Sequence, residues 1–126
     1  MKRLLTAAAA AAATTVCTVA VALPAQAADL TVRLTNPSGA VHAVLTWDDS
    51  VDTLCLTLRS SAAGAIAHAD MRLTSGAYPQ SLRATPSNPR QCTGNLSIPE
   101  DRLAEMRVYG GSNTFWKSSG WQQFYT

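Results

Sequence analysis

The sequence has few residues that carry catalytic or metal-binding chemistry. Its 126 residues include two histidines and three cysteines, and one of these, Cys17, lies in an N-terminal apolar run. No Cys-x-x-Cys motif occurs, which argues against a catalytic disulfide. The G-x-S-x-G motif of a nucleophile elbow is also absent. We therefore predict that the protein is not an enzyme and uses no cofactor.

Charge is scarce as well. Ten Lys and Arg residues and eight Asp and Glu residues give a formal charge of +2. Lys2 and Arg3, which precede an uncharged apolar run from Leu4 to Leu23, account for this excess. Without them the chain is formally neutral, and a neutral domain lacks the field that concentrates nucleic acid or anionic lipid. We expect neither as a partner.

The N-terminal segment has the features of a secretory signal peptide. The basic pair and the apolar run are followed by an A-x-A cleavage site that ends at Ala27. A run of about 20 apolar residues is also long enough to anchor a protein in a bilayer. Pro24 and the small residues directly after the run favour cleavage instead. We predict a signal peptide at residues 1–27, secretion to the extracellular space, and one domain at residues 28–126.

Cleavage removes Cys17 and leaves Cys55 and Cys92, for which only one pairing exists. In an oxidising compartment this pair predicts a disulfide. The alternative is two free thiols that never meet. In the chain-entropy model, closing this loop stabilises the fold by about 4 kcal/mol. That is a large share of a total that is typically about 5–15 kcal/mol.

Apolar and polar residues alternate with a period of two over most of the remaining chain, which predicts strands. Residues 78–94, rich in Pro, Ser and Arg, are expected to be mostly loop. Pro99 is expected to start at most one turn of helix. The predicted strands span residues 30–35, 40–47, 53–59, 65–74, 81–84, 104–109, 113–117 and 121–125, with a brief strand at Leu96 and Ile98.

Seven or eight short strands separated by turns predict an all-β fold. We expect an Ig-like or related antiparallel β-sandwich with one disulfide, Cys55–Cys92, and a monomeric state.

No metal site is predicted. Asp48 and Asp52 match the first and fifth positions of a calcium loop, but Thr53 and Arg59 stand where the loop needs Gly and Glu. We predict a solvated turn here, although a looser carboxylate site including Asp49 stays open.

The two histidines offer little chemistry either. His42 and His68 lie on different predicted strands, and only Asp remains to complete a zinc site. His68 precedes Asp70 on one strand, but no serine is specified for a triad. We expect both histidines to be solvated strand residues.

Aromatic residues are concentrated near the C-terminus. All of them except Trp47 and Tyr78 lie between Tyr109 and Tyr125. Neighbouring strand residues point to opposite faces, and a sandwich buries one face of each sheet, so some of these rings face solvent. Such rings can stack on sugars; the alternative is that they form cross-strand pairs that close the sandwich edge. The candidate binding surface consists of Tyr109, Trp116, Trp121 and Tyr125.

Three segments carry a resemblance to a protein group. The segments from Trp47 to Cys55 and from Cys92 to Asp101, with the final Phe124-Tyr125-Thr126, resemble a group of small secreted actinobacterial proteins of unknown function. The resemblance implies export and pairing of the cysteines. It implies no activity and no site residues.

Together these features predict a secreted, non-enzymatic binding or surface-associated module. Its partner would be a glycan, the cell wall or another protein. The alternative is a small secreted protease or hydrolase inhibitor, in which the Pro-rich segment Tyr78–Gln91 beside Cys92 forms a rigid presenting loop.

Overall fold

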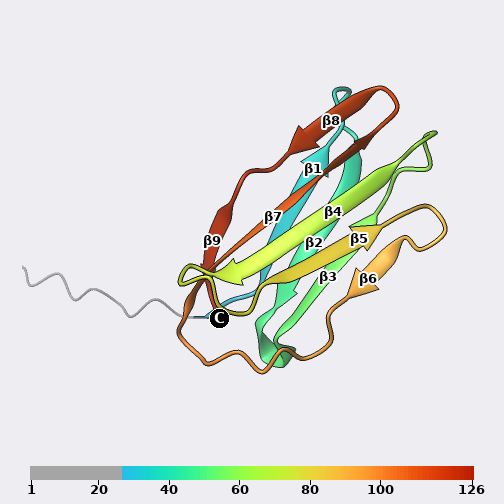
Figure 1. The fold of residues 1–126 in the computed structure, drawn as a ribbon. Helices are drawn as coiled ribbons and strands as arrows, with labels where there is room; N and C mark the ends of the chain where they lie inside the picture. The colour runs from blue at the N-terminus through green and yellow to red at the C-terminus, as the bar shows by residue number, and fades with distance from the viewer. Residues whose placement is uncertain (1–26) are drawn as a thin grey trace, which may run out of the picture.

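The computed structural model describes residues 27–126, which form two antiparallel β-sheets packed face to face (Figure 1). The prediction of an all-β sandwich with one disulfide is confirmed. The predicted signal peptide lies outside the described residues, except for Ala27. Within the described range, no helix has the length and hydropathy needed to cross a membrane.

Sheet A contains four strands in the order β1-β2-β3-β6. The first three follow one another along the chain as a meander, and a short 3-10 turn at Asp49–Val51 joins the second to the third. The strands are β1 (Leu30–Thr35), β2 (Val41–Asp48), β3 (Thr53–Leu58) and β6 (Arg90–Cys92).

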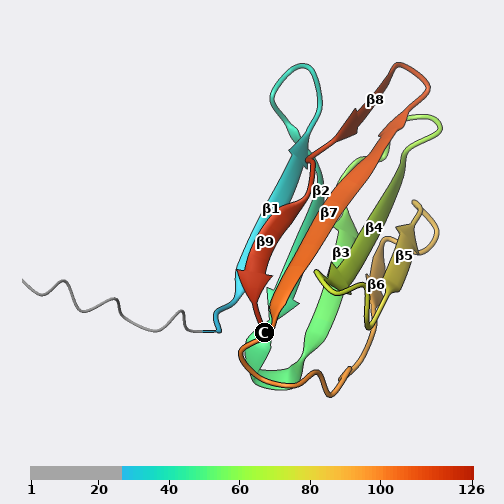
Figure 2. The ribbon, with the colours of Figure 1, turned by 60° about the vertical axis from the view of Figure 1, so that its left-hand side comes forward.

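Sheet B contains five strands in the order β5-β4-β7-β8, with β9 also paired to β7. Figure 2 shows it as the second layer of the sandwich, with β8 and β9 following one another beside β7. The strands are β4 (Ile66–Leu73), β5 (Gln80–Ala84), β7 (Leu103–Ser112), β8 (Phe115–Ser118) and β9 (Gln122–Tyr125).

The period-two pattern explains how the sheets pack. In β2 the apolar residues Leu45 and Trp47 are buried, and in β3 their register partners Leu56 and Leu54 are buried as well. Alternate residues of a strand share a face, so each sheet turns one apolar face inward. The core extends across both sheets and includes Leu34, Ala43, Leu58, Ala67, Ala69, Met71, Ala104, Met106, Val108 and Phe124.

The strand order differs from that of an immunoglobulin domain, so the fold is a related antiparallel β-sandwich. In an immunoglobulin domain the second strand pairs with the first and the fifth. Here β2 pairs with β1 and β3, which are its neighbours in sequence.

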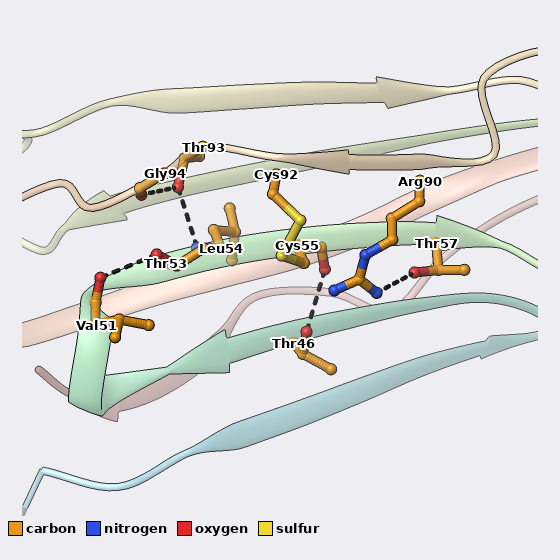
Figure 3. Close-up of a disulfide and its surroundings, with 10 residues drawn as sticks. All are labelled: Thr46, Val51, Thr53, Leu54, Cys55, Thr57, Arg90, Cys92, Thr93 and Gly94. Atoms are coloured by element: carbon orange, nitrogen blue, oxygen red, sulfur yellow. Dashed lines mark hydrogen bonds between the residues drawn. A yellow bond between two sulfur atoms is a disulfide. The ribbon is translucent and has the colours of Figure 1, made fainter.

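The disulfide joins two neighbouring strands of sheet A (Figure 3). Cys55 of β3 lies directly opposite Cys92 of β6, with 4.1 Å between their Cα atoms and a sequence separation of 37. Both lie on the outer face, because the neighbours of Cys55 in β3, Leu54 and Leu56, point into the core. The cross-link therefore holds the short β6 onto the sheet edge.

The short strand predicted at residues 81–84 is present as β5, but two other local predictions were wrong. The rest of segment 78–94, expected to be loop, also contains β6, which follows a tight turn closed by hydrogen bonds between Thr85 and Asn88. Leu96 and Ile98 form no strand: Ser97 between them has a φ of 50°, which breaks an extended backbone. Their amides instead donate to the backbone oxygen and to the carboxylate of Asp52. A turn without helix follows Pro99.

A β-bulge separates β8 from β9. Ser118 pairs with Tyr109 and Gln122 with Met106, so three residues on one side oppose two on the other. Ser119 caps the bulge, because its hydroxyl accepts from the amide of Val108 at 3.0 Å. Gly120 within it has a φ of 72°, a conformation that glycine adopts without steric cost. The extra residue exchanges the two faces of the strand after this point.

Candidate functional site

Aromatic and arginine side chains gather on the outer face of sheet B, where Trp116 and Arg72 are exposed and the others are partly buried. The residues that face outward on β4 and β7 alternate with the buried residues of the core. The bulge adds Trp121 to this face, which already holds Trp116 from β8. We call this surface the aromatic–arginine face, and it consists of His68, Arg72, Arg107, Tyr109, Trp116 and Trp121.

Three rings gather at one end of the face. His68 stacks on Tyr109, with 5.2 Å between ring centroids and 13° between ring planes. Trp116 lies 6.2 Å from His68 and 6.3 Å from Tyr109. Trp116 is 59% exposed, so most of its ring is open to solvent. Trp116 therefore presents a large, flat apolar surface to solvent.

Two arginines line the other end of the face. The guanidinium carbons of Arg72 and Arg107 lie 4.7 and 4.6 Å from the ring centre of Trp121. Arg107 also lies 4.9 Å from the ring centre of Tyr109, which links the two ends of the face. Cation–π contacts of this kind hold the rings in fixed positions on the sheet.

Carboxylates hold both arginines in place. Arg72 donates to Glu105 at 2.7 Å, and Arg107 donates twice to Asp70, at 2.8 and 3.0 Å. The hydroxyl of Ser81 donates to the other oxygen of Asp70 at 2.8 Å. Burial acts to raise the pKa of Asp70, but the hydrogen bonds from Arg107 and Ser81 outweigh it and hold the pKa below its usual value.

The pKa values of the stacked residues, His68 and Tyr109, are also shifted from their usual values. Burial and the nearby charge of Arg83 lower the pKa of His68, against the opposing effect of Asp70. Burial raises the pKa of Tyr109, with a smaller contribution from Asp70. At neutral pH the face therefore presents a neutral imidazole beside a neutral phenol.

Of the four predicted surface residues, the structure brings three together. Tyr109, Trp116 and Trp121 belong to one connected set of contacts. Tyr125 lies on the same side of the sheet but opposite Leu103 at the far end of β7. There it lines a hollow of about 480 Å³ that also includes Arg102. Tyr125 is thus separated from the other three residues of the candidate binding surface.

In the acidic turn at residues 48–52, carboxylates accept hydrogen bonds from other groups of the protein. Asp48 accepts from the amide and hydroxyl of Ser50, and Asp52 accepts from the amide of Ile98. The turn predicted here is therefore present. Among residues 27–126 no group of three or more His, Cys, Asp or Glu side chains is placed to hold a metal ion.

The histidines do not form a catalytic pair. His42, expected to be solvated, is 1% exposed; its Nε2 lies 3.1 Å from the carbonyl oxygen of Ile66 and its ring packs edge-on against Phe115. A bulge near Val41 turns it inward. His68 is partly exposed, but both oxygens of Asp70 are engaged by Arg107 and Ser81. The aromatic–arginine face as a whole can stack on flat apolar groups, donate hydrogen bonds and attract anions.

Sequence reasoning missed the cationic part of the face. Arg72 and His68 stood in the sequence as the polar positions of an alternating run, and Arg107 as a polar position of another. Nothing in the sequence shows that β4 pairs with β7, which places His68 opposite Tyr109 and Arg72 opposite Glu105. The period-two alternation marks all three as outward-facing positions, but no local signal shows that they meet.

The fold and this surface define the class of protein: a small disulfide-linked antiparallel β-sandwich in which one sheet face carries aromatic and arginine side chains, with Trp116 exposed. No protein-family profile, curated protein or solved structure matches this chain.

Proposed function

We propose that this protein is a secreted, non-enzymatic module that binds carbohydrate chains, such as those of a cell wall, through the aromatic–arginine face. The observation that carries this proposal is the exposure of Trp116 beside the stacked rings of His68 and Tyr109. The C–H-rich face of a sugar ring packs well on an aromatic ring of this kind.

Polar groups around the rings fit the same ligand. Ser118 lies opposite Tyr109 in the sheet, and Gln123 lies opposite Glu105. These side chains supply donors and acceptors for hydroxyl groups beside the apolar platform. A sheet face is also shallow, which suits a chain that runs along a surface.

Secretion is part of the proposal. A disulfide persists in oxidising compartments, and Cys55 and Cys92 are cross-linked. The signal-peptide features of residues 1–27 agree with that location. The alternative function as a hydrolase inhibitor stays a prediction: its presenting segment is largely β5 and β6, with only the turn at residues 85–89 between them.

Retention on insoluble polysaccharides tests the binding function. The wild-type domain is incubated with cellulose, chitin and peptidoglycan, beside Trp116→Ala and the double variant Trp116→Ala/Trp121→Ala. We expect retention on at least one polymer and a loss of about 10-fold or more in the double variant, since aromatic contacts of this size are worth about 1–3 kcal/mol.

Tyr78→Ala is the matched control. Tyr78 is an exposed aromatic residue, 39% accessible, in the turn between β4 and β5, and it takes part in none of the ring–ring or cation–π contacts among the described residues. Its removal should leave retention unchanged. Equal retention of wild type and double variant would count against the proposed surface.

A further inference from the structure

Arg83 is a cation without an acidic partner at the edge of the aromatic–arginine face. It lies on β5 directly opposite His68, and its side chain is exposed. The ion pairs found within residues 27–126 join Arg72 to Glu105 and Arg107 to Asp70. Arg83 takes part in neither of them.

The outward-facing charges of sheet B therefore do not cancel. Arg72 and Arg107 are neutralised by their carboxylates, and Arg83 remains as an excess positive charge. Residues 28–126 are formally neutral as a whole, so the negative charge that balances Arg83 lies elsewhere on the domain. A local positive field on a neutral protein selects for a local anionic group on the ligand.

Arg83 lies in the same row of the sheet as the rings of His68 and Tyr109. The register forms a row across four strands in which Arg83, His68, Tyr109 and Ser118 are successive neighbours. With about 4.8 Å between strands, the row is about 14 Å long. Trp116 lies next to the far part of this row. A ligand that touches both Arg83 and Trp116 must span more than one sugar ring.

The charge of Arg83 acts on the imidazole ring of His68. Burial lowers the pKa of His68, and the charge of Arg83 lowers it further. The groups that face His68 are Arg83 from β5, Asp70 from its own strand, Tyr109 from β7 and Trp116 from β8. An anion held by Arg83 would offset that charge at the imidazole.

We propose that the carbohydrate bound by the aromatic–arginine face is acidic, a chain of sugars that carry carboxylate groups, with Trp116 as the stacking platform and Arg83 as the partner of one carboxylate. The inference rests on the proposed carbohydrate function. A guanidinium matches a carboxylate with two parallel hydrogen bonds, which a neutral ester cannot accept in the same way.

The experiment compares two forms of one polymer. Affinities for polygalacturonate and for its fully methyl-esterified form are measured by isothermal titration calorimetry at constant ionic strength. The two share one sugar backbone, and esterification replaces each charged carboxylate by a neutral methyl ester. Because a pair between an exposed guanidinium and a carboxylate is a weak contact in water, we expect the wild-type protein to bind the acid form about 2- to 5-fold more tightly.

Variants assign this preference to one residue. Arg83→Gln should bind both polymers with the affinity of wild type for the ester, and Trp116→Ala should weaken both. Arg33→Gln is the matched control, because Arg33 is an exposed strand arginine on the outer face of sheet A. Its affinities should equal those of wild type. In wild type, the acid form should also raise the pKa of His68 measured by NMR.

The outcomes separate the inference from the function on which it rests. Equal wild-type binding of acid and ester, weakened in Trp116→Ala, would overturn the acidic preference and leave carbohydrate binding intact. Binding of neither polymer would overturn the inference, and failure of every polysaccharide tested would remove the proposed function with it. Polyphosphate bound as tightly as polygalacturonate would show general anion attraction and would also overturn it. Loss of the preference in Arg33→Gln would do the same.

Discussion

The imidazole ring of His68 lies nearly parallel to the phenol ring of Tyr109, with 5.2 Å between ring centroids and 13° between ring planes. The two residues are 41 positions apart in the sequence and meet because β4 pairs with β7 in the register that sets them opposite each other. This pair connects the exposed ring of Trp116 to the arginines farther along the face.

The pKa of His68 should lie below 6.5, and its neighbours should move it in opposite directions. Burial and Arg83 lower it, while Asp70 raises it. We therefore expect Arg83→Gln to raise the pKa and Asp70→Asn to lower it further, as measured by NMR titration of the imidazole protons. A pKa of His68 that is the same in both variants would contradict this account of the face.

The same shift has a consequence for stability. Because the folded pKa is lower than the unfolded value of about 6.5, the unfolded chain binds the proton more readily. The contribution of His68 to the free energy of unfolding should thus be constant above that pH and decrease as the pH falls below it. His68→Gln should remove this part of the pH dependence in denaturant titrations between about pH 7.5 and 5.

The carboxylate of Asp70 should stabilise the fold at neutral pH. Its pKa is held below the usual value by Arg107 and Ser81, so its contribution is fully present above about pH 4 and is lost as the pH falls through the lowered pKa. We expect Asp70→Asn to reduce the free energy of unfolding by up to about 1 kcal/mol at pH 7. Glu100→Gln, at an exposed residue, is the control and should cost nothing measurable. A difference between wild type and Asp70→Asn that persists unchanged at pH 2 would argue against this role.

Gly111 should tolerate no side chain. A Cβ atom there would collide with the backbone oxygen of Phe115, because β8 approaches β7 closely at this point. Gly111→Ala should therefore displace β8 and lower the free energy of unfolding by about 1–3 kcal/mol. Gly39→Ala has open space and only a left-handed backbone to accommodate, so its loss should be about 1 kcal/mol. Urea denaturation measures the free energy of unfolding of both variants. An equal loss in the two would show that the collision with β8 does not destabilise the fold.

The disulfide should be a main support of the fold. The double variant Cys55→Ala/Cys92→Ala should lose about 2–5 kcal/mol of unfolding free energy. Wild type in reductant should lose a similar amount, and the double variant should not respond to reductant at all. Two thiols that react with an alkylating reagent before reduction would show that the cross-link does not form in the natural protein.

Processing can be read from the mass of the exported protein. We expect material in the culture supernatant of an expressing bacterium to begin at Ala28, after the A-x-A site that ends at Ala27. Intact-mass analysis measures this directly. Material that begins at Met1 would remove the proposed secretion by signal cleavage.

Local patterns predicted most of the strands because a strand with one buried face records its burial in the sequence itself. The strand predicted at residues 30–35 is β1, and those at 53–59 and 65–74 differ from β3 and β4 only at their ends. The strand β6 was missed because its three residues carry no alternation, and it is held by the pairing of Cys92 with Cys55 across the sheet.

The candidate site was predictable in part. The density of aromatic residues after Tyr109 drew attention to Trp116 and Trp121, but their common face did not follow from the sequence. In a regular strand two residues five positions apart point to opposite faces. The bulge at Ser119 and Gly120 reverses this, and a bulge depends on how the strand pairs with its neighbour.

By itself, the amino-acid sequence determined the all-β class, most strand positions and the identity of the disulfide partners. Periodicity and cysteine count are local or countable properties, so no knowledge of pairing is needed. The tertiary structure alone decided which strands are neighbours, and thereby set His68 on Tyr109, Arg107 on Trp121 and Arg83 without an acidic partner. Those contacts join segments far apart in the chain, and their register is fixed only when both sheets bury their apolar faces against each other.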